Sequence, residues 1–350
     1  MDKKGAEQAP EAAPHLGTVV IGRNEGARLV ACLSSQPALA PIAYVDSGST
    51  DRSVAQARAA GAHVVQLTSP PSFSAARARN AGMRALLGHF PELEFIQMTD
   101  GDCVLRETWI ESAVTALRAD PSAALVFGRR RELHPDRSIY NALCDDEWNV
   151  PVGEAPACGG DVLFRVAALQ SVGGYNEDMI AGEDPEVSMR LRKNGWRLRR
   201  IDAEMTLHDA DILYFTQFWT RARRSGHAFA ELAHLHPDIR WPDWQRSCWS
   251  IVIWGGAMPS ALATTIVLST FHDRLWWIAS AVLLLAWPAK IAQLSHRQFR
   301  RGLKPKIALV SGSLLMVGKL PQFLGLARFH YGRWRNRASP IIEYKGPSPA

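Results

Sequence analysis

Two acidic residues flank a glycine at Asp100-Gly101-Asp102, directly after the short apolar segment Glu94–Thr99. Such a segment predicts a buried strand, and the Asp-Gly turn then falls at its carboxyl end. Carboxylate oxygens suit Mg²⁺ or Mn²⁺, because these ions take oxygen ligands and share them with substrate phosphates. A solvated Asp-Gly turn is the simpler explanation of the pair taken alone. Its position at a strand end favours the metal.

A second acidic pair, Glu183-Asp184, stands directly before Pro185 and a helical segment that ends at Gly195. This order predicts Asp184 as a helix N-cap with proline at the first helical position. The helix dipole would favour an ionised carboxylate there. Taken alone, the segment is explained by Asp184 capping the helix.

Polar residues also follow two other apolar segments. Arg23-Asn24-Glu25 follows Leu16–Gly22, and a polar acidic stretch follows Ile42–Asp46. The chain has no GxGxxG motif after the first segment and no GxxxxGK[ST] motif, which disfavours a dinucleotide-binding dehydrogenase and a P-loop NTPase.

The elements that must position these residues alternate between apolar strands and helical segments. Near-continuous apolar strands of this kind predict an α/β fold with a doubly wound, mostly parallel sheet and helices on both faces. Ligands of such sheets bind outside the carboxyl ends of the strands. The predicted strands are Leu16–Gly22, Ile42–Asp46, Ala62–Leu67, Glu94–Thr99 and Ala123–Gly128, and the clearest helices are Ser74–Leu87 and Glu107–Leu117.

Two long apolar segments follow the α/β region. Ser250–Thr270 is uncharged, and Leu275–Leu294 has Lys290 as its only charge. Each is long enough to span a bilayer, so we expect a C-terminal membrane helical hairpin. Residues 307–329 contain Lys319 and Pro321, which favours an interfacial or re-entrant segment. Buried core helices of a soluble domain are the alternative.

Charge is distributed unevenly between the two regions. Residues 251–350 contain 13 Lys+Arg and 2 Asp+Glu, a net charge of +11. A basic region of this size suits nucleic acid or an anionic membrane, and the neighbouring apolar segments favour membrane lipids over nucleic acid. Basic clusters flank the hairpin on the same side, which the positive-inside rule assigns to the cytoplasm. They are Arg221, Arg223, Arg224, Arg240 and Arg246 before it, and Arg297, Arg300, Arg301, Lys304 and Lys306 after it.

From about Leu16 to about Ala233 the sequence resembles the family 2 glycosyltransferases, which have the GT-A fold. The resemblance depends on eight motifs in a fixed order, and each is weak alone. They are VVIGRNEG (19–26), VDSGSTD (45–51), SAARARNAG (74–82), TDGD (99–102), CGGDVLFR (158–165), GGYNE (173–177), AGEDPEVSMRLRKNGW (181–196) and TLHD (206–209). It implies a GT-A catalytic domain (16–240). Together with the composition, this divides the chain into a disordered tail (1–15), that domain, membrane-associated helices (250–270, 275–294 and 307–329, the last interfacial or re-entrant) and a basic tail (330–350).

The resemblance also implies a donor site and a metal site. Asp46 would bind the base of the nucleotide and Asp51 would support its loop. Arg79 and Asn80 would contact the nucleoside side. Asp102 would be a metal ligand, Asp100 would lie near the ribose or the metal, and His208 would complete the coordination of Mn²⁺ or Mg²⁺. Arg23, Asn24 and Glu25 complete the expected donor site.

The remaining motifs imply the chemistry. Asp184, beside Glu183, resembles the general base of inverting members, and an ionised carboxylate is the state that such a base needs. The alternative is that Asp184 only caps the helix. Gly159 and Gly160 would allow close backbone approach, and Asp161 would contact the donor sugar or the acceptor. Arg221 and Arg224 either clamp a phosphate or form a basic face beside the membrane.

We therefore expect a metal-dependent, inverting enzyme that uses a nucleotide-diphosphate sugar. Its acceptor would be a lipid-linked or cell-surface glycan at the cytoplasmic face of the inner membrane. A sugar-nucleotide pyrophosphorylase is one alternative, but Arg23-Asn24-Glu25-Gly26 is a poor version of the loop that it needs. A catalytically silent membrane scaffold that binds a nucleotide sugar is the other.

Overall fold

The computed structural model describes residues 15–69, 72–240 and 243–335, which form two compact units. The first unit contains residues 1–134, 144–179 and 183–210, and the second contains 135–143, 180–182 and 211–350. The predicted catalytic domain extended to residue 240, so the division lies about thirty residues earlier. The predicted tails fall almost entirely on residues 1–14 and 336–350, which lie outside the described residues.

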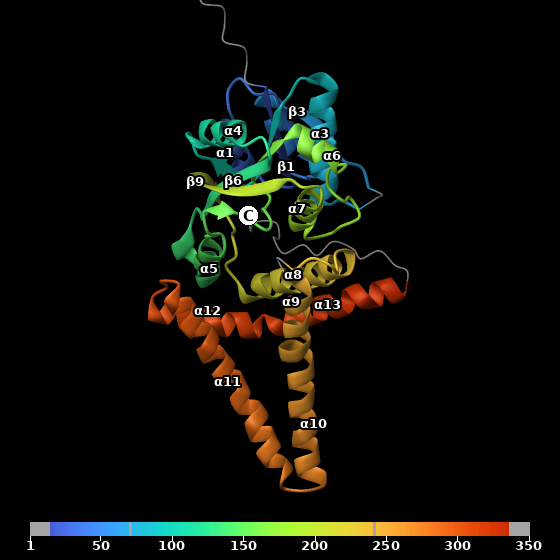
Figure 1. The fold of residues 1–350 in the computed structure, drawn as a ribbon, viewed down its shortest axis with the longest axis vertical. Helices are drawn as coiled ribbons and strands as arrows, with labels where there is room; N and C mark the ends of the chain where they lie inside the picture. Colours follow the sequence, from blue (N-terminus) through green and yellow to red (C-terminus); the bar gives the residue numbers. More distant parts are fainter. Residues whose placement is uncertain (1–14, 70–71, 241–242, 336–350) are drawn as a thin grey trace, which may run out of the picture. The chain divides into compact units, whose positions relative to one another are not determined.

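The first unit is built on a mixed sheet of nine strands among the described residues (Figure 1). The main path runs β3-β2-β1-β4-β8-β6-β9-β5, and β7 pairs with β9. The strands are β1 Leu16–Gly22, β2 Ile42–Asp46, β3 His63–Gln66, β4 Phe95–Asp100, β5 Cys103–Leu105, β6 Ala123–Glu132, β7 Gly153–Glu154, β8 Val162–Arg165 and β9 Arg197–His208. All five strands predicted from the sequence are present, and β6 is longer than expected.

The sheet is parallel from β3 to β4 and between β6 and β9. By contrast, β8 runs antiparallel between β4 and β6, and β5 and β7 run antiparallel to β9. The α/β fold is thus confirmed. The expected parallel arrangement holds for β3-β2-β1-β4 and for the β6–β9 pair, while the other strand pairs are antiparallel. An apolar composition indicates that a strand is buried, but it does not indicate whether the strand pairs in parallel or antiparallel with its neighbours.

Helices cover both faces of this sheet. Successive residues of β1 point to opposite faces: Val19 packs in a core cluster with residues of α3, and Val20 in another with residues of α1 and α2. The helices are α1 Ala27–Ser34, α2 Ser53–Ala59, α3 Ala75–His89, α4 Trp109–Ala119, α6 Val166–Ser171 and α7 Glu183–Lys193. The 3₁₀ turn Pro135–Arg137 and the first half of α5 (Ile139–Glu147) group with the second unit.

The second unit is helical. It contains α8 Phe215–Leu235, α9 Trp244–Ile251, a π-helical segment Val252–Ala257, α10 Met258–Phe271, α11 Trp276–Arg300, α12 Pro305–Val317 and α13 Lys319–Trp334. Three stretches of the described residues are long and apolar enough to cross a membrane: Trp244–Phe271, Trp276–Arg300 and Pro305–Trp334. Both helices of the predicted hairpin are present. The first is the continuous stretch Trp244–Phe271, made of α9, the π-helical segment and α10, and the second is α11; both are longer than expected.

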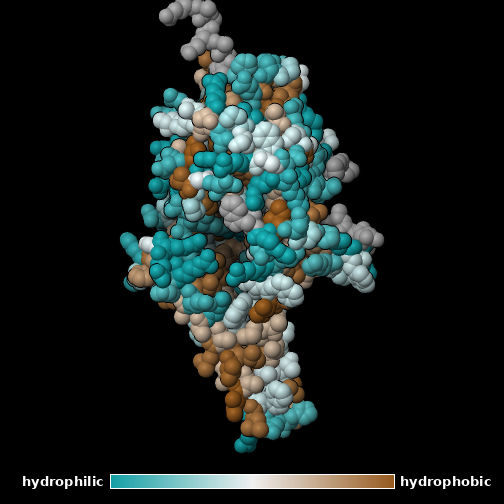
Figure 2. Space-filling model, viewed as in Figure 1, coloured by the Kyte–Doolittle hydropathy of each residue, from teal (hydrophilic) through white to brown (hydrophobic). Residues whose placement is uncertain are grey.

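Within this unit, α10 and α11 form a long hairpin, with α12 and α13 lying across its open end (Figure 1). The flank of the hairpin is mostly hydrophobic and its tip is polar (Figure 2). Exposed apolar side chains such as Val267, Ile278 and Leu285 occupy that flank. The predicted segment 307–329 is two helices that meet at Gly318.

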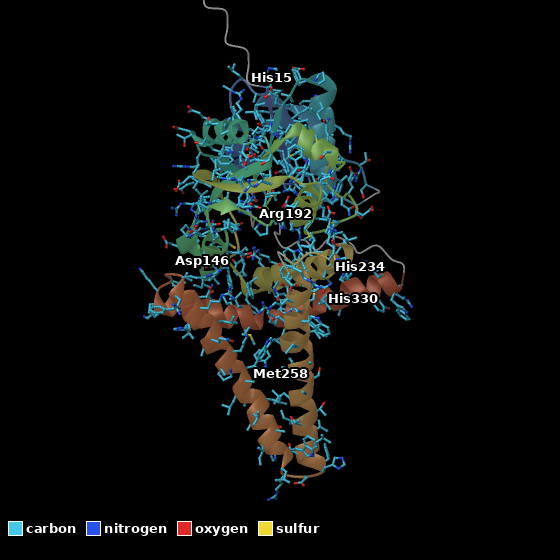
Figure 3. All side chains as sticks on the ribbon, in the orientation of Figure 1. His15, Asp146, Arg192, His234, Met258 and His330 are labelled. Carbon is cyan, nitrogen blue, oxygen red and sulfur yellow. The ribbon has the colours of Figure 1, made fainter. Side chains whose placement is uncertain are left out.

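Glycines let α8 and α13 pack at very short distance. A Cβ added to Gly226 of α8 would collide with the backbone of Gln322, and one added to Gly325 of α13 would collide with the backbone of Arg223. The side chains of His234 and His330 lie near each other along the same pair of helices (Figure 3). Small residues at a crossing allow two backbones to approach, as is common between membrane helices.

Candidate active site

The carboxyl ends of three parallel strands bring the predicted residues to one edge of the sheet. Gly22 of β1 pairs with Asp46 of β2, and Ile21 pairs with Asp100 of β4. The segment after β1, the loop after β2 and the Asp100–Asp102 turn therefore start side by side. This is the edge at which sheets of this class bind ligands.

Asp102 and His208 form a buried polar pair at this edge. His208 Nε2 lies 3.3 Å from Asp102 Oδ2, and both side chains are less than a tenth exposed. The antiparallel pairing of Cys103 with His208 creates this proximity, and the ring of Trp148 lies 4.7 Å from the His208 ring. A carboxylate and an imidazole within this distance fit a divalent cation such as Mn²⁺. Burial raises the pKa of the nearby Cys103 thiol, so the thiol stays neutral.

Arg79 connects the two acidic motifs. From α3, its Nη2 lies 2.9 Å from Asp100 Oδ1, and its Nη1 lies 2.8 Å from Glu183 Oε1 and 3.2 Å from Asp184 Oδ1. The arginine side chain is only 3% exposed. Burial opposes its charge, but Asp184 and Asp100 outweigh that effect and raise the pKa of Arg79. The residues on the two sides of the site are therefore held together by one buried cation.

Two expectations for Asp184 are wrong. The helix α7 begins at Glu183, so Asp184 lies in its first turn and is not the N-cap. Its carboxylate instead forms an ion pair with Arg79. Burial raises the pKa of Asp184 to about 7. The positive charge of Arg79 opposes this increase, and the negative charge of Glu183 adds to it. The helix dipole therefore does not keep this carboxylate strongly acidic. A carboxylate with a pKa near neutrality is well suited to accept and release a proton.

Arg130 and Asp161 support the turn that contains Asp100. Asp161 is fully buried, and its Oδ2 accepts a hydrogen bond from Thr206 and lies 2.7 Å from Arg130 Nη2. Its Oδ1 accepts a hydrogen bond from the backbone N–H of Asp100. Burial opposes ionisation of Asp100, but Arg79 and Arg130 overcome it and lower the pKa of Asp100. These contacts give Asp161 a supporting position beneath the turn.

Gly160 leaves room for the Arg79–Asp100 pair. A Cβ at this position would collide with Arg79 Nη2 and would lie 2.8 Å from Asp100 Oδ2. The neighbouring Gly159 has open space where its Cβ would be. Gly160 therefore has a steric requirement that Gly159 lacks.

The loops after β1 and β2 are joined by side-chain hydrogen bonds. Asp46 Oδ2 accepts from the backbone N–H groups of Gly48 and Ser49, while Asn24 Oδ1 accepts from the N–H of Thr50. Asp51 accepts from the N–H groups of Gly26 and Ser53. Arg23 lies 5.7 Å from the Phe73 ring centroid, and Glu25 pairs with Arg28. The predicted acidic residues therefore shape these loops.

The side chain of Asn80 forms hydrogen bonds with the segment that precedes α7. Its Nδ2 donates to the carbonyl of Tyr175 and to Glu177 Oε1, and its Oδ1 accepts from the N–H of Tyr175. It is 4% exposed. Asn80 thus fixes the GGYNE segment beside Arg79, whose guanidinium lies over the Tyr175 ring.

Two family models match the chain. The model of glycosyl transferase family 2 covers residues 19–163, and that of glycosyl transferase family group 2 covers residues 148–290. Together they extend from β1 into the membrane-type helices and include every predicted site residue. The chain is a member of the family 2 glycosyltransferases.

The individual comparisons agree with this family. The chain is 30% identical over 237 residues to the pre-mycofactocin glycosyltransferase of Mycobacterium tuberculosis, found in two strains, with 64% of this chain covered. It spans about half of those relatives, 47% of their length. A mannosyltransferase from Pyrobaculum calidifontis, solved with GDP-Man and Mn²⁺, has the same fold with a TM-score of 0.57. The two are 19% identical, with 90% of this chain and 91% of that chain covered.

Arg221 and Arg224 of this family 2 glycosyltransferase lie on α8, in the second unit, whereas the other predicted site residues belong to the first. Both are half-buried. Their assignment as a phosphate clamp stays a prediction.

Sequence reasoning missed Arg130, Trp148 and Thr206. Arg130 is the middle member of three arginines at the end of β6, where the pairing with β9 has an irregular register. Simple alternation along the strand therefore does not single it out. Thr206 and Trp148 become neighbours of the site only through strand pairing and the path of the chain after α5, which the sequence does not encode locally.

Proposed function

We propose that this protein is a metal-dependent, inverting glycosyltransferase that transfers a sugar from a nucleotide-diphosphate sugar to a lipid-linked or cell-surface glycan acceptor. The observation that carries the proposal is the bridge made by Arg79 between Asp100 of the Asp-Gly-Asp turn and the Glu183-Asp184 pair. It joins a donor-side acidic turn to a carboxylate whose pKa is about 7. Family membership supports both roles.

In the proposed site, Asp102 and His208 would hold Mn²⁺ or Mg²⁺. Such an ion supplies positive charge that stabilises a diphosphate leaving group. Asp184 would accept the proton of the acceptor hydroxyl as that oxygen attacks the anomeric carbon, and Arg79 would hold Asp184 in place. One direct displacement inverts the configuration, so an α-linked donor would give a β-linked product. Asn24, Asp46 and Asp51 would shape the loops that receive the nucleotide.

The proposed donor and ion agree with the Pyrobaculum mannosyltransferase, which was solved with GDP-Man and Mn²⁺. The three membrane-type helices support a membrane-associated enzyme. We propose that it lies in the inner membrane, because the basic clusters at the open end of the hairpin favour a cytoplasmic catalytic unit. A lipid-linked acceptor would be available there.

Calorimetric titration of the detergent-solubilised protein tests the donor half of the proposal without an acceptor. UDP, GDP and dTDP would each be titrated with Mn²⁺ present and again with EDTA. We expect one diphosphate to bind, and to bind only when Mn²⁺ is present. A folded protein that binds none of them would contradict the proposal, and binding that EDTA leaves unchanged would contradict its metal dependence.

A further inference from the structure

A cavity of about 630 Å³ lies within the second unit, near the open end of the membrane-type hairpin. Residues from α9, the π-helical segment, α11, α12 and α13 line it. Four of the lining residues are cations: Arg246, Lys290, Arg297 and Lys319. The active-site chemistry described above uses none of them.

The cavity has an excess of positive charge. Its only lining carboxylate, Asp243, accepts a hydrogen bond from the backbone N–H of Arg246 and so caps α9. Within the described part of the chain, none of the four cations has a carboxylate at ion-pair distance. Lys290 donates to Gln293 Oε1 and lies 5.8 Å from the Trp254 ring centroid. Lys290 and Lys319 are half-buried, so this charge is only partly exposed to solvent.

The cations lie at the depth of a membrane boundary. Lys290 is 14 residues from Trp276 along α11, or about 21 Å from the hairpin tip, and Arg297 is about 32 Å from it. A hydrocarbon core is about 30 Å thick, so these two cations bracket its edge on the open side of the hairpin. Lipid phosphates lie just outside that edge, and the long side chains of Lys and Arg can reach them from within the core. Ionisable residues inside membrane segments are expensive and usually functional.

The other residues that line the cavity favour a lipid over a free anion. Trp254, Leu294, Leu315 and Met316 give the cavity an apolar side beside the cations. The π-helical segment that carries Trp254 also contains Gly255, where an added Cβ would collide with the backbone of Lys319. That close approach brings Lys319 to the cavity. Irregular π-helical turns often occur at functional sites.

We propose that this cavity binds the phosphate group of a membrane lipid, with Lys290, Lys319, Arg246 and Arg297 around the phosphate and the apolar side along the chain. Two sources share this chemistry, an anionic glycerophospholipid and a polyprenyl phosphate. The site does not depend on glycosyl transfer. Only the polyprenyl source would also bear on the proposed function, as its acceptor.

The test is a binding measurement on the full chain in detergent micelles without nucleotide sugar. A fluorescent phosphatidylglycerol is the probe, and phosphatidylcholine, polyprenyl phosphate and inorganic phosphate are the competitors. The wild type should bind the probe, and Lys290→Gln/Lys319→Gln should bind it at least about tenfold more weakly, because charge-assisted hydrogen bonds to phosphate are lost. Arg300→Gln/Lys306→Gln removes two cations of the same unit that do not line the cavity, and it should bind as the wild type does.

Competition identifies the source. Displacement by polyprenyl phosphate at lower concentration than unlabelled phosphatidylglycerol indicates the carrier lipid, and the reverse order indicates a glycerophospholipid. Equal affinity of the cavity variant and the wild type would overturn the proposal. So would displacement by phosphatidylcholine or inorganic phosphate as effective as that by the anionic lipids. Lys290→Arg/Lys319→Arg keeps both charges and should retain binding, which separates loss of charge from misfolding.

Discussion

A single arginine balances three carboxylates in the active site. Arg79 lies within 3.2 Å of oxygens from Asp100, Glu183 and Asp184. Arg130 forms a second ion pair with Asp100, at 3.5 Å, and has a weaker effect on Asp184. Asp100 therefore forms ion pairs with two arginines, whereas Asp184 forms one with Arg79 alone among the described residues. This difference explains why the pKa of Asp100 is lowered while that of Asp184 is raised, although both are buried.

The first prediction concerns the proposed base. Asp184→Asn keeps the shape of the side chain but cannot accept a proton, so the transfer rate should fall by about 10²–10⁴-fold. Nucleotide-diphosphate affinity, measured by calorimetry, should stay close to that of the wild type because Asp102 and His208 are unchanged. Loss of rate and nucleotide affinity together would instead make Asp184 a structural residue. Unchanged activity would reject the base outright.

The second prediction concerns pH. A base must be unprotonated in the free enzyme, so kcat/KM should be low in acid and should rise with a midpoint at about 7, the raised pKa of Asp184. Initial rates between pH 5 and 9, at saturating Mn²⁺, measure this profile. A value of kcat/KM that stays constant from pH 5 to 7 would contradict the raised pKa of Asp184, because an ordinary aspartate is already ionised throughout that range.

The third prediction uses two adjacent glycines. Gly160→Ala places a Cβ against Arg79 and Asp100 and should displace the bridge, lowering the transfer rate by tenfold or more. Gly159→Ala is the matched control, because its Cβ would meet open space. Steady-state kinetics on both variants decide the outcome. Equal rates would show that the Arg79–Asp100 contact does not contribute to catalysis.

At the level of elements, the sequence predicted strand ends better than strand directions. The acidic turn after β4 lies at the predicted edge because apolar segments mark where a buried strand stops. Antiparallel β8 could not be predicted, since its direction depends on a long connection and not on its own residues. Arg79 was predicted as a functional residue, but its bridging contacts join residues more than 100 positions apart, such as Glu183.

The fourth prediction tests the crossing of α8 and α13. Gly325→Ala would place a Cβ against the backbone of Arg223, so the helices must separate, at a cost of about 1–3 kcal/mol. The apparent midpoint of thermal unfolding in detergent should fall. Gly88→Ala in α3 is the control, because no atom lies within 4 Å of its Cβ, and it should leave the midpoint equal or slightly higher. Equal midpoints for the two variants would contradict tight packing at the crossing.

The whole molecule combines a chemical unit with a membrane-type unit of opposite charge balance. Residues 1–250 contain 27 Lys+Arg and 32 Asp+Glu, whereas residues 251–350 contain 13 and 2. Composition was sufficient to predict this division and the hairpin. Composition alone did not indicate that α8 groups with the helical unit, because α8 carries charged residues and is not a long apolar segment.

The fifth prediction concerns orientation. With Cys248→Ser as background, His272→Cys at the hairpin tip should react with a membrane-impermeant maleimide added to intact bacterial cells. Lys306→Cys, at the open end, should react only after the cells are permeabilised. Both positions are exposed, so accessibility alone does not separate them. The reverse labelling pattern would place the catalytic unit outside the cytoplasm.

The division of the chain between the units has a practical consequence for making a soluble enzyme. Ser138 donates to the carbonyl of Ile212, and Asn141 accepts from its N–H, while Tyr140 stacks on Phe218. A protein shortened to end at residue 210 would keep the 135–143 segment but lose all of these partners. Removing the membrane anchor therefore calls for redesign of an internal loop as well as a new stop codon.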